Sequence, residues 1–136
     1  MSDILNPLAC ELHCMRLCAD FAHYADSRDY DKFVALFTED GTFELRGETL
    51  RGRNAILRAM RARPDDMITR HICTNIRIDA HDNGTATGAG SLLLFHRVAN
   101  ENVEPSMIVA DYRDVYKVTA SHWRIQERVT TIVFNS

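Results

Sequence analysis

The spacing of apolar residues changes near residue 66, and this change limits the folds open to the chain. Before it, apolar side chains recur every three or four positions, as in amphipathic helices. After it, they alternate with a period of two over four long segments, as in half-buried strands. Helices followed by a run of antiparallel strands predict an α+β fold, with the helices packed on one face of a strongly curved sheet.

The breaks between these segments set the expected boundaries. Asn6 and Pro7 predict the start of the first helix, because Asn caps helices and Pro fits the first turn. Asn83-Gly84 predicts a tight hairpin, because both residues tolerate a positive φ. The expected helices cover 7–26, 30–37 and 53–61. The expected strands cover 42–46, 49–51, 68–79, 85–98, 107–118 and 123–134, with a turn at 38–41. With 136 residues, a single domain over 1–136 is expected.

Charge and hydropathy exclude several classes of function. The formal net charge is −3, so the chain has no bulk electrostatic attraction to nucleic acid. No apolar run reaches the length of a membrane span. Asp3, Glu11 and Arg16 are atypical of a secretory signal, so we expect a cytoplasmic protein that contacts neither membrane nor nucleic acid.

The first helix carries a carboxylate in line with an apolar ridge. The ridge steps by three and four residues and reaches Asp26. A carboxylate on a buried face is costly unless it is paired or hydrogen-bonded, so Asp26 is expected to have a partner or to meet water at the helix end. The expected ridge consists of Leu8, Leu12, Met15, Ala19 and Ala22.

Cysteines and histidines give no metal motif. Cys10, Cys14 and Cys18 recur every four residues on the first helix and are expected to be buried as small apolar groups. No pair among the six histidines has the His-x-His or His-x3-His spacing typical of metal ligands. We therefore expect neither a metal site nor a disulfide, and His96 and His122 are expected at the surface.

The strand over 68–79 separates two sets of side chains. His71 and Cys73 fall on one face, and Ile72, Ile76 and Ile78 on the other. An outer face that presents three isoleucines predicts a homo-oligomer, either a trimer or a dimer.

Several short motifs, in this order, resemble the SnoaL-like branch of the NTF2-like superfamily. The segments 37–43 (FTEDGTF), 52–56 (GRNAI), 71–78 (HICTNIRI) and 123–125 (WRI) are similar to its recurring motifs. The resemblance covers nearly the whole chain and implies a cone-shaped NTF2-like domain. Within that branch, Tyr24-Ala25-Asp26-Ser27 resembles scytalone dehydratase, and His71 with Thr74-Asn75 resembles lindane dehydrochlorinase.

The resemblance implies a set of site residues. Asp26 and His71 would form the acid–base pair that both relatives use to eliminate a small leaving group. Arg128 would offset charge on the leaving group or anion, although its phase with Arg124 and Gln126 also fits a solvated strand face. Phe21 stands where the dehydrochlorinase has a lysine. No match to the second catalytic histidine of the dehydratase is found, and its strand carries Val109, Asp111 and Tyr112. Substrate contacts are expected from Tyr24, Phe21 and either Asp111 or Tyr112.

The chemistry expected from such a pair follows from elementary principles. A carboxylate that accepts a hydrogen bond from an imidazole fixes its tautomer and makes the other nitrogen a general base. The expected activity is a cofactor-independent, dehydratase-like or dehydrohalogenase-like elimination on a small hydrophobic, cyclic molecule in an apolar pocket. Two alternatives stay open: a non-catalytic subunit like the β-subunit of ring-hydroxylating dioxygenases or a ligand-binding domain, and an isomerase or polyketide cyclase with Asp26 as base.

Overall fold

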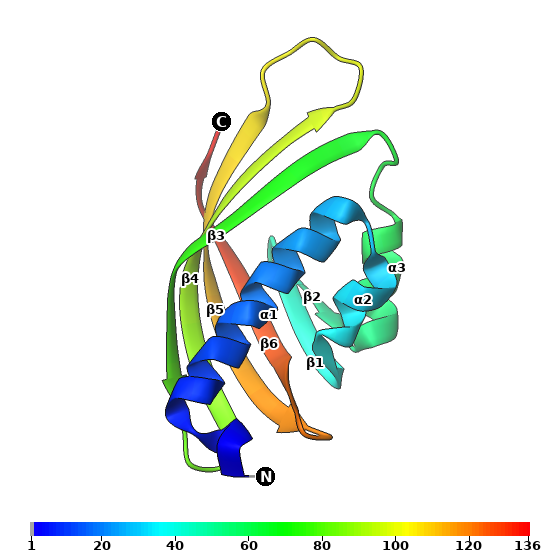
Figure 1. The fold of residues 1–136 in the computed structure, drawn as a ribbon. Helices are drawn as coiled ribbons and strands as arrows, with labels where there is room; N and C mark the ends of the chain where they lie inside the picture. The colour runs from blue at the N-terminus through cyan, green and yellow to red at the C-terminus, as the bar shows by residue number, and fades with distance from the viewer. Residues whose placement is uncertain (1) are drawn as a thin grey trace.

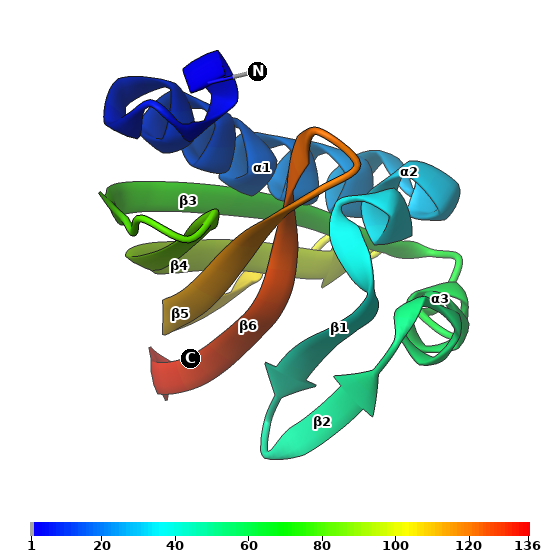
Figure 2. The ribbon, with the colours of Figure 1, turned by 90° about the horizontal axis from the view of Figure 1, so that it is seen from below.

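The computed structural model describes residues 2–136 and has an α+β architecture in which helices cover one face of a single curved sheet (Figures 1 and 2). The six strands lie in the order β2-β1-β6-β5-β4-β3, and only β1 and β6 run parallel. The sheet is curved and does not close on itself (Figure 2). The elements are η1 (Ser2–Leu5), α1 (Pro7–Ser27), α2 (Tyr30–Ala35), β1 (Phe37–Leu45), β2 (Glu48–Arg51), α3 (Arg53–Arg61), β3 (Met67–Ala80), β4 (Thr85–Val98), β5 (Ser106–Thr119) and β6 (His122–Asn135). The predicted fold class and order of elements are confirmed.

Helix α1 has well-defined ends. The Asn6 side chain accepts a hydrogen bond from the backbone N–H of Leu8 at 2.9 Å, and Pro7 occupies the first turn, as predicted. At the other end Arg28 adopts a left-handed conformation, with φ of 62°, and its N–H bonds the carbonyl of Ala25. The helix therefore stops just after Asp26, which leaves that side chain beside the edge of the sheet.

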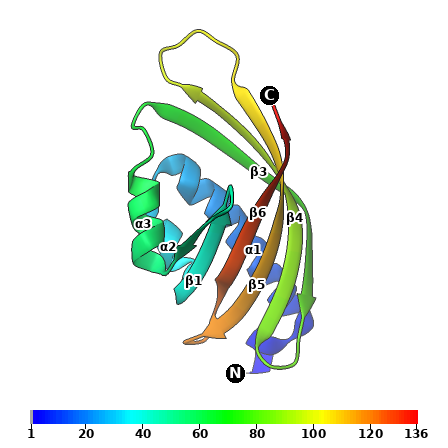
Figure 3. The same cartoon turned by 180° about the vertical axis from the view of Figure 1, so that it is seen from behind.

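The buried ridge of α1 differs from the predicted one. Leu8 and Leu12 are 77% and 70% exposed, and Met15 is also exposed. The buried side chains are Cys10, Cys14, Leu17, Cys18, Phe21 and Ala25. Helix α1 packs along β3 (Figures 1 and 3), and cysteine is small enough to let the two elements lie close together. The prediction that the cysteines are buried as apolar groups is confirmed for the three on α1.

The segment after α2 was also predicted incorrectly. The helix ends at Ala35, and β1 begins at Phe37, so residues 38–41 lie within a strand rather than in a turn. The pairing of β1 with β6 is irregular between Phe37 and Thr42. A Cβ on Gly41 would lie 3.0 Å from the Thr38 carbonyl oxygen and 3.1 Å from that of Ile125. A side chain at that position would therefore require the backbone of β1 or of β6 to shift slightly.

A bulge in β3 changes which side chains face the helices. The pairing of β3 with β4 shifts between Thr74 and Arg77, and Asn75 has a φ of 54°. Beyond the bulge, Ile76 and Ile78 pack against the core, whereas Ile72 stays on the outer face, 47% exposed. The prediction that all three isoleucines face outward is wrong, because the extra residue reverses the alternation.

The hairpin between β3 and β4 lies where it was predicted, but its loop is longer. Residues 81–84 separate the strands, and the His81 N–H bonds the Thr85 carbonyl at 2.9 Å. Only Gly84 within this loop has a positive φ, of 75°. No helix within residues 2–136 is long and apolar enough to span a membrane.

Candidate active site

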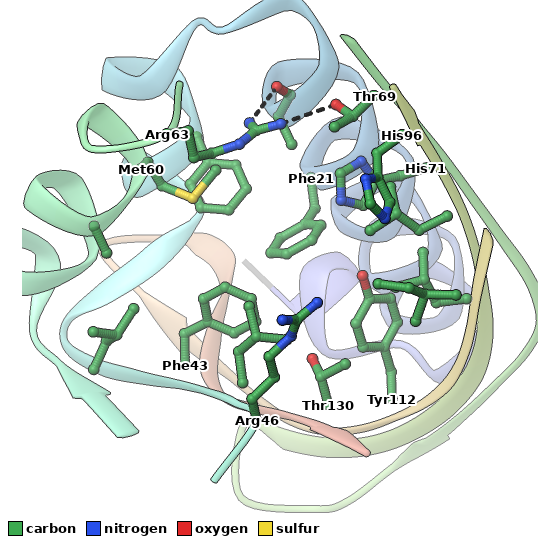
Figure 4. Close-up of a pocket in the computed structure, with 18 of the residues that line it drawn as sticks. Phe21, Phe43, Arg46, Met60, Arg63, Thr69, His71, His96, Tyr112 and Thr130 are labelled. Carbon is green, nitrogen blue, oxygen red and sulfur yellow. Dashed lines mark hydrogen bonds between the residues drawn. The ribbon is translucent and has the colours of Figure 1, made fainter. Parts of the chain in front are cut away.

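A cavity of about 270 Å³ opens between the concave face of the sheet, the end of α1 and helix α3 (Figure 4). Its wall is mainly apolar, with a few polar groups that reach into it. The apolar lining includes Phe21, Phe33, Phe43, Leu50, Met60, Leu92, Leu94 and Ile108. The polar lining consists of Arg46, Arg63, Thr69, His71, His96, Tyr112 and Thr130. An apolar hollow with a few convergent polar groups is typical of a small-molecule site.

Asp26 and His71 lie in direct contact at the edge of this cavity. The Nδ1 atom of His71 lies 2.6 Å from Oδ1 of Asp26, and both side chains are largely buried. The backbone N–H of His71 also donates to Oδ2 of the same carboxylate, at 2.9 Å. The end of α1 and the start of β3 bring the two residues together, since α1 packs along β3.

A third donor completes the surroundings of the Asp26 carboxylate. The Thr69 hydroxyl donates to Oδ1 of Asp26 at 2.9 Å. Burial alone would raise the pKa of Asp26, but the hydrogen bonds from His71 and Thr69 outweigh it, so this pKa lies below its usual value. Asp26 is therefore an ionised acceptor, and it is absent from the cavity lining formed by the described residues.

The second ring nitrogen of His71 remains available to a ligand. With Nδ1 bound to a carboxylate, Nδ1 carries the proton in the neutral ring, and Nε2 has the free lone pair. The ring lines the cavity and meets Phe21 edge-on, with ring centroids 6.4 Å apart. The pair thus presents a basic nitrogen to an apolar space.

Tyr112, on β5, contributes a hydrogen-bond donor to the cavity, on the same side as His71 (Figure 4). Its ring is buried, and within residues 2–136 its hydroxyl has no hydrogen-bond partner. Burial raises the pKa of Tyr112, so the phenol stays protonated and can donate to an oxygen atom in the cavity. The structure places Tyr112, and not Asp111, in the cavity: Asp111 is exposed and lines a groove with Asn75.

Arg128 lies behind the cavity wall rather than in it. Its side chain is 0% exposed, and its Nε and Nη2 atoms donate to Asp114 at 2.8 and 2.9 Å. The guanidinium carbon lies 3.9 Å from the ring centroid of Tyr112 and 4.5 Å from that of Phe21. Arg128 therefore does not make the predicted direct contact with a leaving group, because the rings of Phe21 and Tyr112 line the cavity and Arg128 does not. Neither is Arg128 on a solvated strand face.

A buried polar network surrounds this arginine. Asp114 also accepts a hydrogen bond from the Tyr116 hydroxyl at 2.7 Å, and Arg128 Nη2 contacts Sγ of Cys18 at 3.1 Å. Burial disfavours the charge of Arg128, but Asp114 outweighs burial and raises its pKa. A hydrogen bond from Cys73 and the charge of Arg128 lower the pKa of Cys18. The network holds Arg128 beneath the rings of Phe21 and Tyr112 and so supports the cavity wall.

Tyr24 does not reach the cavity. Its ring packs at the rim of the core, against His23 at 5.6 Å between ring centroids, and it is not among the lining residues in the described chain. The predicted substrate contact of Tyr24 is therefore not supported by its position. Phe21, by contrast, lines the cavity as predicted.

His96 lines the cavity, although it was predicted to lie at the surface. It pairs with Thr69 across β3 and β4, while His71 pairs with Leu94 two residues earlier on β4. His96 is thus a diagonal neighbour of His71 on the same face. Only the strand register could have revealed this, because nothing in the local sequence around His96 distinguishes it. Thr69 and Thr130, both on strands, were missed for the same reason, and Arg46 and Arg63 were missed because they lie in turns between elements.

No three His, Cys, Asp or Glu side chains come close enough to hold a metal ion in the part of the chain that the structure describes.

The match to a family model identifies the chain. Residues 7–129 match the model of the SnoaL-like domain, so the chain belongs to the SnoaL-like domain family, as its motifs indicated. A search of curated proteins finds no match.

Solved structures share the fold over most of the chain. A "Putative Scytalone Dehydratase" from Novosphingobium aromaticivorans has a TM-score of 0.87 at 20% identity, covering 100% of this chain and 91% of that one. LinA has a TM-score of 0.87 at 22% identity, covering 100% and 93%. Rv3472, a protein of unknown function from Mycobacterium tuberculosis, has a TM-score of 0.80 at 25% identity, covering 89% and 70%. Together with a neighbour described as cystatin-like, these matches confirm the cone-shaped NTF2-like fold.

Proposed function

We propose that this protein is a cofactor-independent lyase that eliminates water or another small group from a small hydrophobic, cyclic substrate. The observation that carries the proposal is the 2.6 Å contact between Asp26 Oδ1 and His71 Nδ1 at an open apolar cavity. A poised base next to an apolar space suits removal of a proton from carbon. The likeness to a scytalone dehydratase and to LinA supports a reaction of this class.

In the proposed step, Nε2 of His71 takes a proton from a carbon next to a carbonyl or another activating group. The electron pair of the broken C–H bond forms the double bond, and the leaving group departs with the electrons of its own bond. Asp26 stabilises the imidazolium that results. The Tyr112 hydroxyl donates to the substrate oxygen on which negative charge develops.

His96 favours loss of a hydroxyl over loss of a halide. A hydroxyl leaves as water only if it receives a proton, whereas a halide leaves as an ion. His96 lines the same wall as His71 and can supply that proton from its imidazolium form. We therefore propose a dehydratase, with His71 as base and His96 as acid.

The cavity limits the size of the substrate. A volume of about 270 Å³ lies near the lower end of small-molecule sites, which span roughly 300–1,000 Å³. This space suits a molecule of one or two fused rings. Aromatic walls at Phe21, Phe33 and Phe43 favour a flat ring system.

A scaffolding subunit and an isomerase receive less support from the geometry. A scaffolding subunit needs no cavity, whereas this cone has an open one. An isomerase with Asp26 as base needs a free carboxylate in the cavity, whereas Asp26 accepts three hydrogen bonds outside its lining.

The test is turnover of cyclic β-hydroxyketones and cyclic halides, followed by the ultraviolet absorbance of the conjugated alkene. We expect the hydroxyketones to react, and His71→Gln and Asp26→Asn to lower kcat/KM by about a hundredfold or more. His23→Gln and Asp20→Asn, on the outer side of α1, are the matched controls. Turnover that survives in both site variants would contradict the proposal, as would the absence of turnover across the panel.

A further inference from the structure

Arg63 connects three elements at the edge of the cavity (Figure 4). It lies in the bend after α3, where its own N–H bonds the Met60 carbonyl at 3.2 Å. Its Nη1 donates to the carbonyl of Ala25 at 2.9 Å and to the Tyr30 hydroxyl at 3.1 Å, and its Nη2 donates to Oγ1 of Thr69 at 2.9 Å. One guanidinium thus holds the end of α1, the start of α2 and strand β3.

The contact with Thr69 fixes the direction of a proton. A guanidinium only donates hydrogen bonds, so Oγ1 of Thr69 acts as acceptor toward Arg63. The single hydroxyl proton of Thr69 is then directed to its other neighbour, Oδ1 of Asp26, at 2.9 Å. Arg63 therefore uses a lone pair of Thr69 and leaves its only proton for the carboxylate that binds His71.

Within residues 2–136, no carboxylate forms an ion pair with Arg63. Its three partners are a backbone carbonyl and two hydroxyls, all neutral. Asp26 is the anion nearest along the hydrogen-bond chain, one hydroxyl away. A cation at that position stabilises the Asp26 carboxylate and disfavours a positive charge on His71.

We propose that Arg63 is a positioning residue that, through Thr69, orients the Asp26 carboxylate and opposes the gain of positive charge at the pair that Asp26 forms with His71. The role as a catalytic aid rests on the proposed elimination, whereas the effect on the two titrations does not.

Other ionisable groups also face His71 and must be held constant in a test. They come from every element around the ring: Asp26 from α1, Arg46 from the turn after β1, His96 from β4, Tyr112 from β5, and Arg128 from β6 behind Phe21. Arg70, the neighbour on β3, bonds its own strand at the Thr69 carbonyl. Substitution of Arg63 changes the identity of none of them.

The first arm of the test measures the titration of His71 by NMR in the absence of substrate, with the signal assigned from His71→Gln. In Arg63→Met we expect the pKa of His71 to rise by about half to one unit, because a nearby cation is lost. The control is Arg61→Met. Arg61 lies two residues before Arg63, is exposed and is paired with Asp31, so its removal should leave the pKa of His71 unchanged. An unchanged His71 titration in a folded Arg63→Met protein overturns the proposal.

The second arm tests the hydroxyl and remains decisive if Arg63→Met fails to fold. Thr69→Val removes the donor at similar volume, and Thr69→Ser retains it. We expect the pKa of the Asp26 carboxyl to rise in Thr69→Val and to return toward the original value in Thr69→Ser. A purely structural role for Thr69 would give equal Asp26 titrations in both variants and overturn the proposal.

Activity measurements separate this proposal from the proposed function. Shifted titrations without turnover on the panel would support the Arg63 arrangement and contradict the lyase. Turnover that depends on Asp26 and His71, with unshifted titrations, would support the lyase and contradict the role of Arg63. If both proposals hold, the acid limb of the pH profile of kcat/KM should move to higher pH in Arg63→Met, in parallel with the pKa of His71.

Discussion

His71 binds Asp26 twice, through its ring nitrogen at 2.6 Å and through its backbone N–H at 2.9 Å. The backbone bond fixes the carboxylate relative to β3, and the ring bond then fixes the imidazole relative to the carboxylate. The orientation of the ring therefore depends on the strand as well as on the side chain, which makes the pair more rigid than a contact between two side chains.

The ionisation of Asp26 makes folding stability depend on pH. Its pKa is below the value of about 3.9 for an unfolded chain, so its stabilisation is fully present above that value and is lost as pH falls through the folded pKa. We expect Asp26→Asn to flatten the acid side of the free energy of unfolding, measured in urea between about pH 2 and pH 6. Asp82→Asn, an exposed carboxylate in the hairpin loop, is the control and should keep the acid dependence. Equal profiles for the two variants would show that Asp26 carries no such linkage.

Loss of the Tyr112 hydroxyl should affect turnover and not folding. Since that hydroxyl bonds no protein group in the described chain, Tyr112→Phe should change the free energy of unfolding by less than about 0.5 kcal/mol. If the hydroxyl donates to the substrate oxygen, kcat should fall by about a hundredfold. Both quantities come from urea unfolding and from the alkene assay. A fully active Tyr112→Phe enzyme would remove Tyr112 from the mechanism.

The buried pair of Arg128 and Asp114 should be strongly non-additive. Arg128→Met leaves the carboxylate of Asp114 buried without its counter-charge, and we expect a loss of about 3–5 kcal/mol in the free energy of unfolding. The double variant Arg128→Met, Asp114→Leu removes both charges and should be more stable than Arg128→Met alone. Urea unfolding of the single and double variants gives the coupling energy. Purely additive losses would mean that the two charges do not depend on each other.

The close passage of β1 at Gly41 gives a steric prediction. Because a Cβ there would lie 3.0 and 3.1 Å from two backbone carbonyl oxygens, Gly41→Ala should cost about 1–3 kcal/mol. The matched control is Gly90→Ala, where the nearest atoms lie at 3.6 Å and the loss should be smaller. Thermal or urea unfolding measures both. Similar stabilities for the two variants would show that β1 can move away from its neighbours.

The order of helices and strands was predictable because the hydrophobic period is a local property. The buried ridge of α1 was not predictable, because the helix carries two apolar ridges. Packing against the sheet buries the ridge of Cys10 and Cys14 and leaves the ridge of Leu8 and Leu12 exposed. The prediction placed Asp26 on the ridge that proves to be exposed. Asp26 follows Ala25, which lies on the buried ridge, and its side chain therefore still reaches β3.

The site was only partly predictable for a related reason. The motifs around Asp26 and His71 indicated the pair through a family resemblance, and the two residues do lie in contact. His96, Thr69 and Arg63 depend on strand register and on the path of the chain after α3, which no short motif encodes. Arg128 was expected in the cavity, but whether an arginine stands on a wall or behind it depends on the rings packed over it.

The bulge at Asn75 joins two halves of β3 whose alternation has opposite phase. The half before it, with Thr69 and His71, carries the site, and the half after it, with Ile76 and Ile78, packs against the core. Deletion of Asn75 should therefore turn Ile76 and Ile78 toward the outer face, or reverse the faces of the half that carries the site. A single extra residue thus lets one strand serve the cavity at one end and the core at the other from the same side of the sheet.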